Sequence, residues 1–196
     1  MRGRYPGRCV GLPFRAFISA DLPTLAPIEA LVQDLRSASR ELKLVSPDHL
    51  HLTLKFLGDT EEGLVPEIVS AMREAGVGVG PLDLRVRGMG AFPNPERPNV
   101  IWVGVEGAEA LGKMAKSLNA NLEALGFEAE HRAWSPHVTL ARVRIPRGLD
   151  RVRQILEERS SQEFARVRIE EIRLKKSVLQ PQGPEYTTVE SVRLEG

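Results

Sequence analysis

The stretch HLTLKFLG, residues 51–58, alternates apolar with polar residues in the pattern of a half-buried β-strand. Successive side chains of a strand point to opposite faces, so His51 and Thr53 are expected side by side on a face that the core does not use. The apolar side chains of the stretch fit the buried face: Leu52, Leu54 and Phe56.

A second stretch, HVTLARV at residues 137–143, repeats this arrangement. His137 and Thr139 are expected on one face, and Val138 and Leu140 on the other. A single His-x-Thr sequence in a strand is common and is more often structural than catalytic. Two copies, each followed by Leu, indicate a shared site.

The two copies occupy matched places in an internal repeat. Each follows an apolar strand and a helix, with FRAFISA before the first copy and VIWVGV before the second. From Ile18 to Thr53 is 35 positions, and from Val103 to Thr139 is 36. The repeat predicts two similar lobes related by a pseudo-twofold axis, with the two His-x-Thr faces brought together across a cleft.

The remaining periodicities predict the other elements. Helices are expected at about 27–42, 66–76, 108–125 and 149–159. Further strands are expected at 14–20, 82–89, 100–105, 165–169, 173–179 and 187–194. The segment GAFPNPERP, residues 90–98, is expected to be a loop because it contains too many prolines for a strand ladder.

The composition bounds the class of protein. The chain has 196 residues and a formal net charge of +1, so no global basic field indicates nucleic acid, and any phosphate site must be local. Cys9 is the only cysteine, which excludes an intrachain disulfide and a cysteine-rich zinc site and fits a reducing cytoplasm. No segment has the length and apolarity of a membrane helix, so we expect a cytoplasmic protein with no membrane contact. Residues 1–13 are expected to be a flexible extension, and residues 14–196 a single bilobal domain.

Two histidines on facing strands can serve as base and acid in one turnover, because the imidazole pKa lies near neutrality. At a phosphodiester, one imidazole takes a proton from the attacking water while the other protonates the leaving oxygen from the opposite side of phosphorus. Thr53 and Thr139 can donate hydroxyl hydrogen bonds to the non-bridging oxygens. Arg142 can add a charge-assisted bond to the phosphate. Strict alternation points Arg142 away from His137, so it contributes only if a bulge or the strand end re-aims it.

Other residues have competing interpretations. His49 shares a face with His51, so a His-x-His metal site is conceivable, but no carboxylate has convincing ligand spacing and we expect no metal. His49 and His131 are expected to be surface or turn residues. Trp134 is expected to pack rather than to stack on a base.

Phe92, in the proline-rich loop, and Tyr186, in the last turn, are better placed to stack on a nucleobase, although aromatic residues in loops more often act as anchors. Several basic residues can form a local phosphate-binding patch and can equally be solvated strand and loop residues: Arg85, Arg87, Arg97, Arg144, Arg147, Lys175 and Lys176.

At these residues the sequence resembles the two-histidine phosphoesterases. The resemblance rests on HLTLKFLG and PHVTLAR, on the opening FRAFISADLP, and on NVIWVGV between them. Within that superfamily it is most similar to the bacterial and archaeal RNA 2′,3′-cyclic phosphodiesterases, first described as 2′-5′ RNA ligases. The resemblance covers nearly the whole chain from Phe14 and includes the closing segment SVLQPQGPEYTTVESVRL. Residues 1–13 depart from the family, which usually opens on the first strand.

The resemblance implies an α+β, bilobal fold, with two antiparallel β-sheets lining a central cleft and helices on the outside. It implies metal-independent hydrolysis of a terminal 2′,3′-cyclic phosphate to a 2′-phosphate, without a cofactor. His51 and His137 would be catalytic, the first as acid to the 3′ oxygen and the second as base to water. Thr53, Thr139 and Arg142 would bind the phosphate.

The expected partner is RNA with a 2′,3′-cyclic phosphate end, or a cyclic nucleotide, and the expected state is a monomer. Two alternatives stay open. One is 2′-5′ RNA ligation by the reverse chemistry. The other is a non-catalytic RNA-end binding module, which the two imidazoles disfavour because Arg or Lys suits binding alone better.

Overall fold

The computed structural model describes residues 12–180 and 183–196. Its helices are α1 (Ala26–Ala38), α2 (Val65–Gly76), α3 (Glu109–Glu123) and α4 (Asp150–Glu158), with short 3-10 turns at Pro47–His49 and Glu62–Leu64. Its strands are β1 (Phe14–Asp21), β2 (Leu42–Leu44), β3 (His51–Thr60), β4 (Leu82–Phe92), β5 (Val100–Glu106), β6 (His137–Val143), β7 (Glu163–Ile169), β8 (Glu171–Gln180) and β9 (Gly183–Arg193). The predicted extension lies mostly outside the described residues, as does Cys9. None of the described helices has the length and apolarity needed to cross a membrane.

Several predicted boundaries were wrong. The last strand begins at Gly183 instead of residue 187. The first helix ends at Ala38 instead of about residue 42, because Ser39 is extended and its hydroxyl accepts a hydrogen bond from the backbone N–H of Glu41. The chain then forms the short strand β2. The loop predicted at residues 90–98 begins at Pro93 in the structure, three residues later than expected. No proline interrupts the strand before Pro93, so β4 continues through Phe92.

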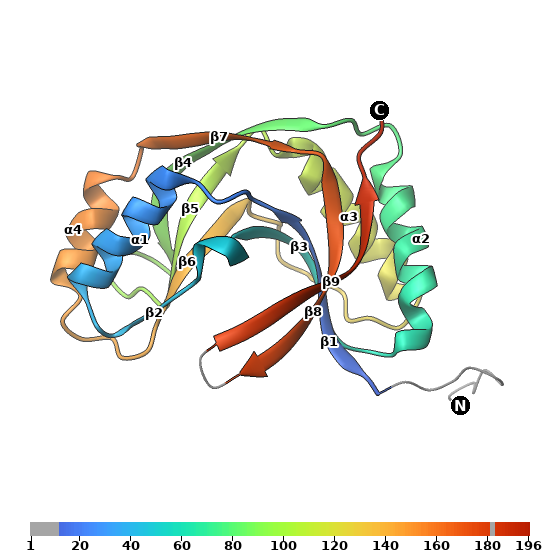
Figure 1. Cartoon of the computed structure of the whole chain (residues 1–196), viewed down its shortest axis with the longest axis horizontal. Coiled ribbons are helices and arrows are strands. Elements are labelled where there is room, and N and C mark those ends of the chain that lie inside the picture. The colour runs from blue at the N-terminus through green and yellow to red at the C-terminus, as the bar shows by residue number, and fades with distance from the viewer. Residues whose placement is uncertain (1–11, 181–182) are drawn as a thin grey trace.

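Within the described residues, the strands form a single nine-stranded sheet in the order β7-β4-β5-β6-β3-β1-β8-β9, with β2 paired to β6. All of the pairings are antiparallel. The α+β class is therefore confirmed, but the expectation of two separate sheets was wrong. Leu52 of β3 pairs with Val138 of β6, and this pair joins the two halves into one curled sheet (Figure 1).

The helices pack in two pairs, α1 with α4 and α2 with α3, at opposite ends of the curled sheet (Figure 1). α1 and α4 contact β7 and β4, while α2 and α3 contact β9 and β3. The helix that follows β1 therefore packs on the other half of the sheet. The apolar stripe of each helix joins one continuous core with the sheet.

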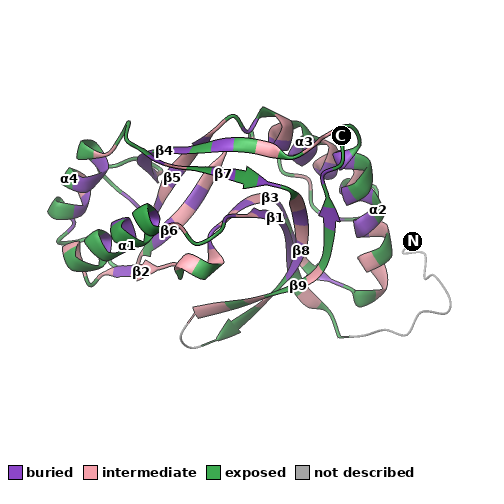
Figure 2. Cartoon of the chain, turned by 45° about the horizontal axis from the view of Figure 1, so that its top comes forward, coloured by how far each residue is buried: buried purple, intermediate pink, exposed green. Residues whose placement is uncertain are grey.

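One face of the sheet belongs to this core and the other does not. Leu52 and Val138 are fully buried among helix residues such as Ile28 and Leu118. Their neighbours along the strands point to the opposite side, which the helices leave uncovered. We call this side the open face. Figure 2 shows buried and partly exposed residues alternating along the strands, as a sheet covered on one side requires.

Candidate active site

The two His-x-Thr sequences lie on adjacent strands at the centre of the sheet. Because Leu52 and Val138 are antiparallel partners, the chain direction brings His51 toward Thr139 and Thr53 toward His137. All four side chains belong to the open face and are partly exposed. The two histidines are thus diagonal neighbours across the Leu52–Val138 pair, an arrangement in which side chains on one face of an antiparallel sheet come close enough to act on one ligand.

The same hydrogen bond orients each imidazole. Nδ1 of His51 lies 2.7 Å from the carbonyl oxygen of His49, and Nδ1 of His137 lies 2.8 Å from that of Ser135. A carbonyl oxygen can only accept, so each Nδ1 carries the proton and donates. In the neutral form of either ring, Nε2 is consequently unprotonated and available for proton transfer.

Aromatic rings pack against both histidines. The ring of Phe17 lies 5.0 Å from that of His51, and the ring of Phe92 lies 4.9 Å from that of His137, measured between centroids. Tyr186 also packs edge-on against His51, at 5.5 Å. These contacts restrict the orientation of each imidazole.

An ionic cluster lies beside His51 and has no counterpart beside His137 among the residues that the structure describes. Asp21 is the cross-strand partner of His51, and its Oδ2 accepts from Lys175 at 2.7 Å and from Arg173 at 3.0 Å. The cross-strand partner of His137 on β5 is Gly104, which has no side chain and therefore no charge. The two histidines therefore share a geometry but differ in electrostatic environment.

The pKa of His51 is lowered from its ordinary value, mainly because burial disfavours the charged imidazolium. The positive charge of Lys175 lowers the pKa further, while the hydrogen bond to the carbonyl of His49 and the negative charge of Asp21 oppose the shift. The pKa of the Asp21 carboxyl is itself lowered. Burial raises it, but the hydrogen bond and charge of Lys175, the hydrogen bond from Ser19 and the charge of Arg173 outweigh burial.

A β-bulge redirects Arg142 to the open face. Trp102 of β5 pairs with Thr139 while its neighbour Ile101 pairs with Ala141, so Leu140 is an extra residue on β6. Leu140 and Ala141 are both fully buried, and Arg142 is exposed. The alternation thus shifts by one position, and Arg142 returns to the side of His137. The pKa of the Tyr186 hydroxyl is raised by burial, and the positive charge of Arg142 partly opposes this shift.

The first motif contains the same irregularity. Ile18 of β1 pairs with Lys55 and Ser19 pairs with Thr53, so Leu54 is the extra residue on β3. Phe56 is consequently on the open face and 68% exposed. Its assignment to the buried face was wrong, because that assignment assumed unbroken alternation. Phe56 and Arg142 each follow their histidine by five positions.

Lys55 shows the complementary effect of this bulge. It is 5% exposed on the core side, where its ammonium donates to Oδ1 of Asn119 at 2.7 Å and to the carbonyl oxygen of Glu128. Burial lowers the pKa of Lys55, although nearby glutamates oppose the shift, with Glu130 the strongest. Unbroken alternation would place Lys55 on the open face with Thr53, but the bulge turns it to the core side, where it stabilises the contact between β3 and α3.

Trp134 connects the two motifs, and its role as a packing residue is confirmed. It packs against the core, and its indole Nε1 donates to the carbonyl oxygen of Thr53 at 2.8 Å. His131 is exposed, while His49 ends a 3-10 turn and packs 5.2 Å from the ring of Tyr186. No three His, Cys, Asp or Glu side chains gather in the described part of the chain in a way that could hold a metal ion.

The two aromatic residues proposed for base stacking are in strands rather than in loops. Phe92 is the last residue of β4, and Tyr186 lies inside β9, opposite Ser177. Both are partly exposed and contact a histidine ring. Both were expected outside the strands, Phe92 in the proline-rich loop and Tyr186 in the last turn. Phe56, which it missed, is the more exposed aromatic residue of the site.

The basic residues of the predicted patch do not form one surface. Arg85 and Arg87 pair with Glu106 on the half of the sheet that contains β7. Lys175 belongs to the ionic cluster at His51, and Lys176 lies over the ring of Phe14. Arg97, Arg144 and Arg147 are exposed in or near the loops beside β6.

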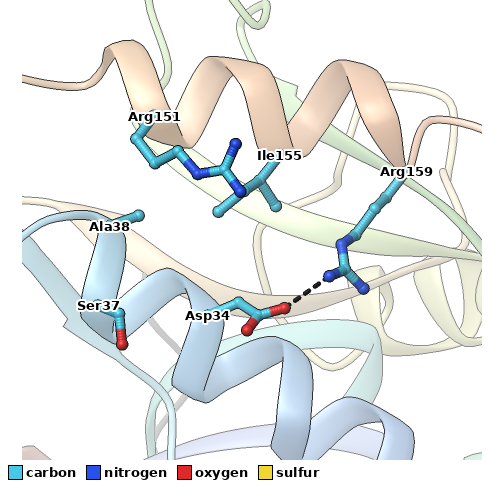
Figure 3. Close-up of a pocket in the computed structure, with 6 residues that line it drawn as sticks. All are labelled: Asp34, Ser37, Ala38, Arg151, Ile155 and Arg159. Carbon is cyan, nitrogen blue, oxygen red and sulfur yellow. Dashed lines mark hydrogen bonds and ion pairs between the residues drawn. The ribbon is translucent and has the colours of Figure 1, made fainter.

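A cavity of about 260 Å³ lies away from the histidines, between α1 and α4 (Figure 3). Asp34 and Arg159 form an ion pair of 2.6 Å across it, and Arg151 reaches into it from α4. The cavity is lined by residues of the two helices and by none of the predicted site residues.

Comparison with known proteins agrees with this geometry. The family model described as the 2′-5′ RNA ligase superfamily matches residues 24–178. The chain belongs to the 2′-5′ RNA ligase superfamily. The resemblance inferred from the two motifs is thereby confirmed.

Curated relatives in this superfamily carry the name RNA 2′,3′-cyclic phosphodiesterase. One, from Methanothermobacter thermautotrophicus, is 39% identical over 182 residues that cover 92% of this chain and 98% of the relative. Another, from Aeropyrum pernix, is 38% identical over 153 residues that cover 78% of this chain and 86% of the relative.

Solved structures in the same comparison share the fold. The crystal structure of a protein from Thermus thermophilus is similar with a TM-score of 0.78 and 30% identity, covering 93% of this chain and 98% of that one. Escherichia coli LigT complexed with 3′-AMP has a TM-score of 0.73 at 22% identity, with 94% and 99% coverage.

Proposed function

We propose that this protein hydrolyses the terminal 2′,3′-cyclic phosphate of RNA, or of a cyclic nucleotide, to a 2′-phosphate, using His51 and His137 as acid and base. The observation that carries the proposal is the pair of identically oriented imidazoles on adjacent strands. The names of relatives that match 92% and 78% of this chain support the choice of substrate.

In the proposed reaction, Nε2 of His137 takes a proton from water, and the water oxygen forms a bond to phosphorus. The bond from phosphorus to the 3′ oxygen breaks, and Nε2 of protonated His51 gives that oxygen a proton. Each histidine ends in the opposite protonation state, so proton exchange with solvent completes the cycle. Because burial lowers the pKa of His51, its imidazolium is a stronger acid than an ordinary one, which suits a proton donor.

The neighbouring open-face residues have roles that follow from their positions. The hydroxyls of Thr53 and Thr139 can donate to the non-bridging oxygens, and Arg142 can add a charge-assisted bond. Phe56, exposed on the open face and in ring contact with Phe17, can stack on the terminal base. The whole set requires neither a metal ion nor an organic cofactor for the transfers described.

A direct test is to incubate the protein with adenosine 2′,3′-cyclic phosphate and to follow ring opening by phosphorus NMR. The expected result is formation of the 2′-monophosphate at a rate that a chelator leaves unchanged. Loss of activity in chelator with rescue by zinc would contradict the two-histidine mechanism. No ring opening at all would leave RNA-end binding as the function.

The superfamily description also names RNA ligation, which is the same chemistry with a 5′-hydroxyl in place of water. Adding an oligonucleotide with a free 5′-hydroxyl to the assay separates the two outcomes. A 2′-5′ linked product would show ligation, and a 2′-phosphate alone would show hydrolysis.

A further inference from the structure

A cluster of basic residues adjoins the open face at the end of β6. We call it the β6 basic patch, and its members are Lys43, Arg142, Arg144 and Arg147. Lys43 is the cross-strand partner of Arg142, so their side chains lie on the same side of the sheet. The backbone N–H of Arg144 donates to the carbonyl oxygen of Glu41 at 2.8 Å, which keeps Arg144 beside β2. Arg147 follows in the loop after β6.

The charges of this patch are available to a ligand. None of its members makes an ion pair within 4 Å with a described residue, and its three arginines are exposed. Arginines on β7, the edge strand of the same half of the sheet, differ in this respect. Arg166 pairs with Glu163, and Arg168 pairs with Asp83. Those side chains are neutralised by their neighbours, whereas the patch carries uncompensated positive charge.

The patch is continuous with the site. Arg142 belongs to both, since the bulge at Leu140 places it on the side of His137. Lys43 extends toward the hairpin of β8 and β9, where its Cε lies 3.9 Å from the position that a Cβ on Gly183 would occupy. A ligand held at the histidines can therefore extend along the end of β6 without leaving the positive surface.

We propose that the β6 basic patch binds the backbone phosphates of the RNA that precede the terminal nucleotide. This inference rests on the proposed function, because it assumes that the cyclic phosphate occupies the histidine pair. An RNA that ends in a cyclic phosphate continues from the 5′ oxygen of the same ribose, so its next phosphates must leave the site along the protein surface. A row of free guanidinium groups beside Arg142 is suited to them. The patch would favour an RNA strand over a mononucleotide.

The test compares two double variants that remove equal charge. R144Q/R147Q removes two members of the patch, and R166Q/R168Q removes two exposed arginines that are already paired. Each is assayed on adenosine 2′,3′-cyclic phosphate and on a hexanucleotide ending in a 2′,3′-cyclic phosphate, at low and at physiological salt. We expect kcat/KM of R144Q/R147Q to fall about tenfold on the hexanucleotide at low salt and to stay unchanged on the mononucleotide. The control variant should match wild type on both substrates.

Binding separates this inference from the proposed function. The Kd of a hexanucleotide ending in a 2′-phosphate, measured by fluorescence anisotropy, needs no turnover. In a plot of the logarithm of affinity against the logarithm of salt concentration, the slope for R144Q/R147Q should be shallower than that of wild type by about 1.4. Each phosphate contact to single-stranded nucleic acid contributes about 0.7 to this slope, and the variant removes two contacts. Equal losses in the two double variants, or unchanged binding in R144Q/R147Q, would overturn the inference even if wild type hydrolyses both substrates. Absence of turnover with a normal binding result would overturn the proposed function alone.

Discussion

The ammonium of Lys175 lies 2.7 Å from a carboxylate oxygen of Asp21, and Asp21 is the residue directly across the β1–β3 ladder from His51. Lys175 is 5% exposed, so this ion pair is shielded from solvent. The pair places one negative and one positive charge close to the imidazole that we propose as the acid. Its two members act on His51 with opposite sign.

Neutralising Asp21 and neutralising Lys175 should shift the pH–rate profile of the reaction in opposite directions. Asp21→Asn removes a charge that raises the pKa of His51, and Lys175→Met removes one that lowers it. The limb of the kcat/KM profile that reports His51 should move to lower pH in the first variant and to higher pH in the second. Profiles that move together, or not at all, would show that the cluster only stabilises the fold.

Asp21→Asn should also lower the free energy of unfolding, measured in urea, by about 3–5 kcal/mol, because Lys175 is left buried without its partner.

The lowered pKa of His51 predicts how stability changes with pH. In the folded protein the imidazole binds a proton less readily than in the unfolded chain, whose pKa is near 6.5. Below pH 6.5 the unfolded state therefore binds more protons than the folded state. The contribution of neutral His51 to the free energy of unfolding is fully present above pH 6.5 and is lost as the pH falls. Urea unfolding between pH 8 and pH 5.5 measures the effect. His51→Gln should lose less stability than wild type over this range, and an identical loss would contradict the prediction.

Each histidine should be required for turnover. His51→Ala and His137→Ala should each reduce kcat by roughly 10² to 10⁴, the usual contribution of general acid–base catalysis. The double variant should lose little more than the worse single variant, because the two groups act in one step. His131→Ala, on an exposed histidine, is the matched control and should keep wild-type activity. Full activity in either single variant on a cyclic nucleotide would exclude the two-histidine mechanism.

Phe56 should contribute to binding rather than to chemistry. Stacking on a base is worth about 1–3 kcal/mol, so Phe56→Ala should raise KM for the cyclic nucleotide about 5- to 150-fold with a smaller change in kcat. Phe56→Trp should restore the wild-type value, because any aromatic face can stack. The side chain is 68% exposed, so thermal stability should stay unchanged. A loss of stability equal to the loss of binding would indicate a structural role.

The sequence predicted the elements of the fold well, because each has a clear apolar period. The stripe of α3 and the alternation in β3 and β6 determine which faces are buried, and both motifs have the predicted strand positions. The predicted site side chains, including Arg142, share the open face. What periodicity cannot show is a bulge, because one extra residue leaves the local composition unchanged. Arg142 was placed correctly only on the condition of a bulge, and Phe56 was misplaced because no bulge was considered there.

The number of sheets was beyond the same reasoning. An internal repeat predicts similar halves, but it contains no signal for how their edges meet. Leu52 and Val138 can lie at the centre of a single sheet because both are apolar and because neither of their strands contains a proline. The end of the first helix was missed for a related reason. Ser39 and Glu41 form a local hydrogen bond that helical periodicity does not reveal.

The direct pairing of β3 with β6 has a mechanical consequence. In enzymes whose reactive groups come from separate domains, substrate capture is commonly accompanied by hinge closure that brings those groups together. Here the backbone ladder through Leu52 and Val138 sets the spacing between the two imidazoles before any substrate arrives. Turnover should consequently proceed without rotation of one half against the other, and substrate selection should depend on the shape and charge of a preformed surface.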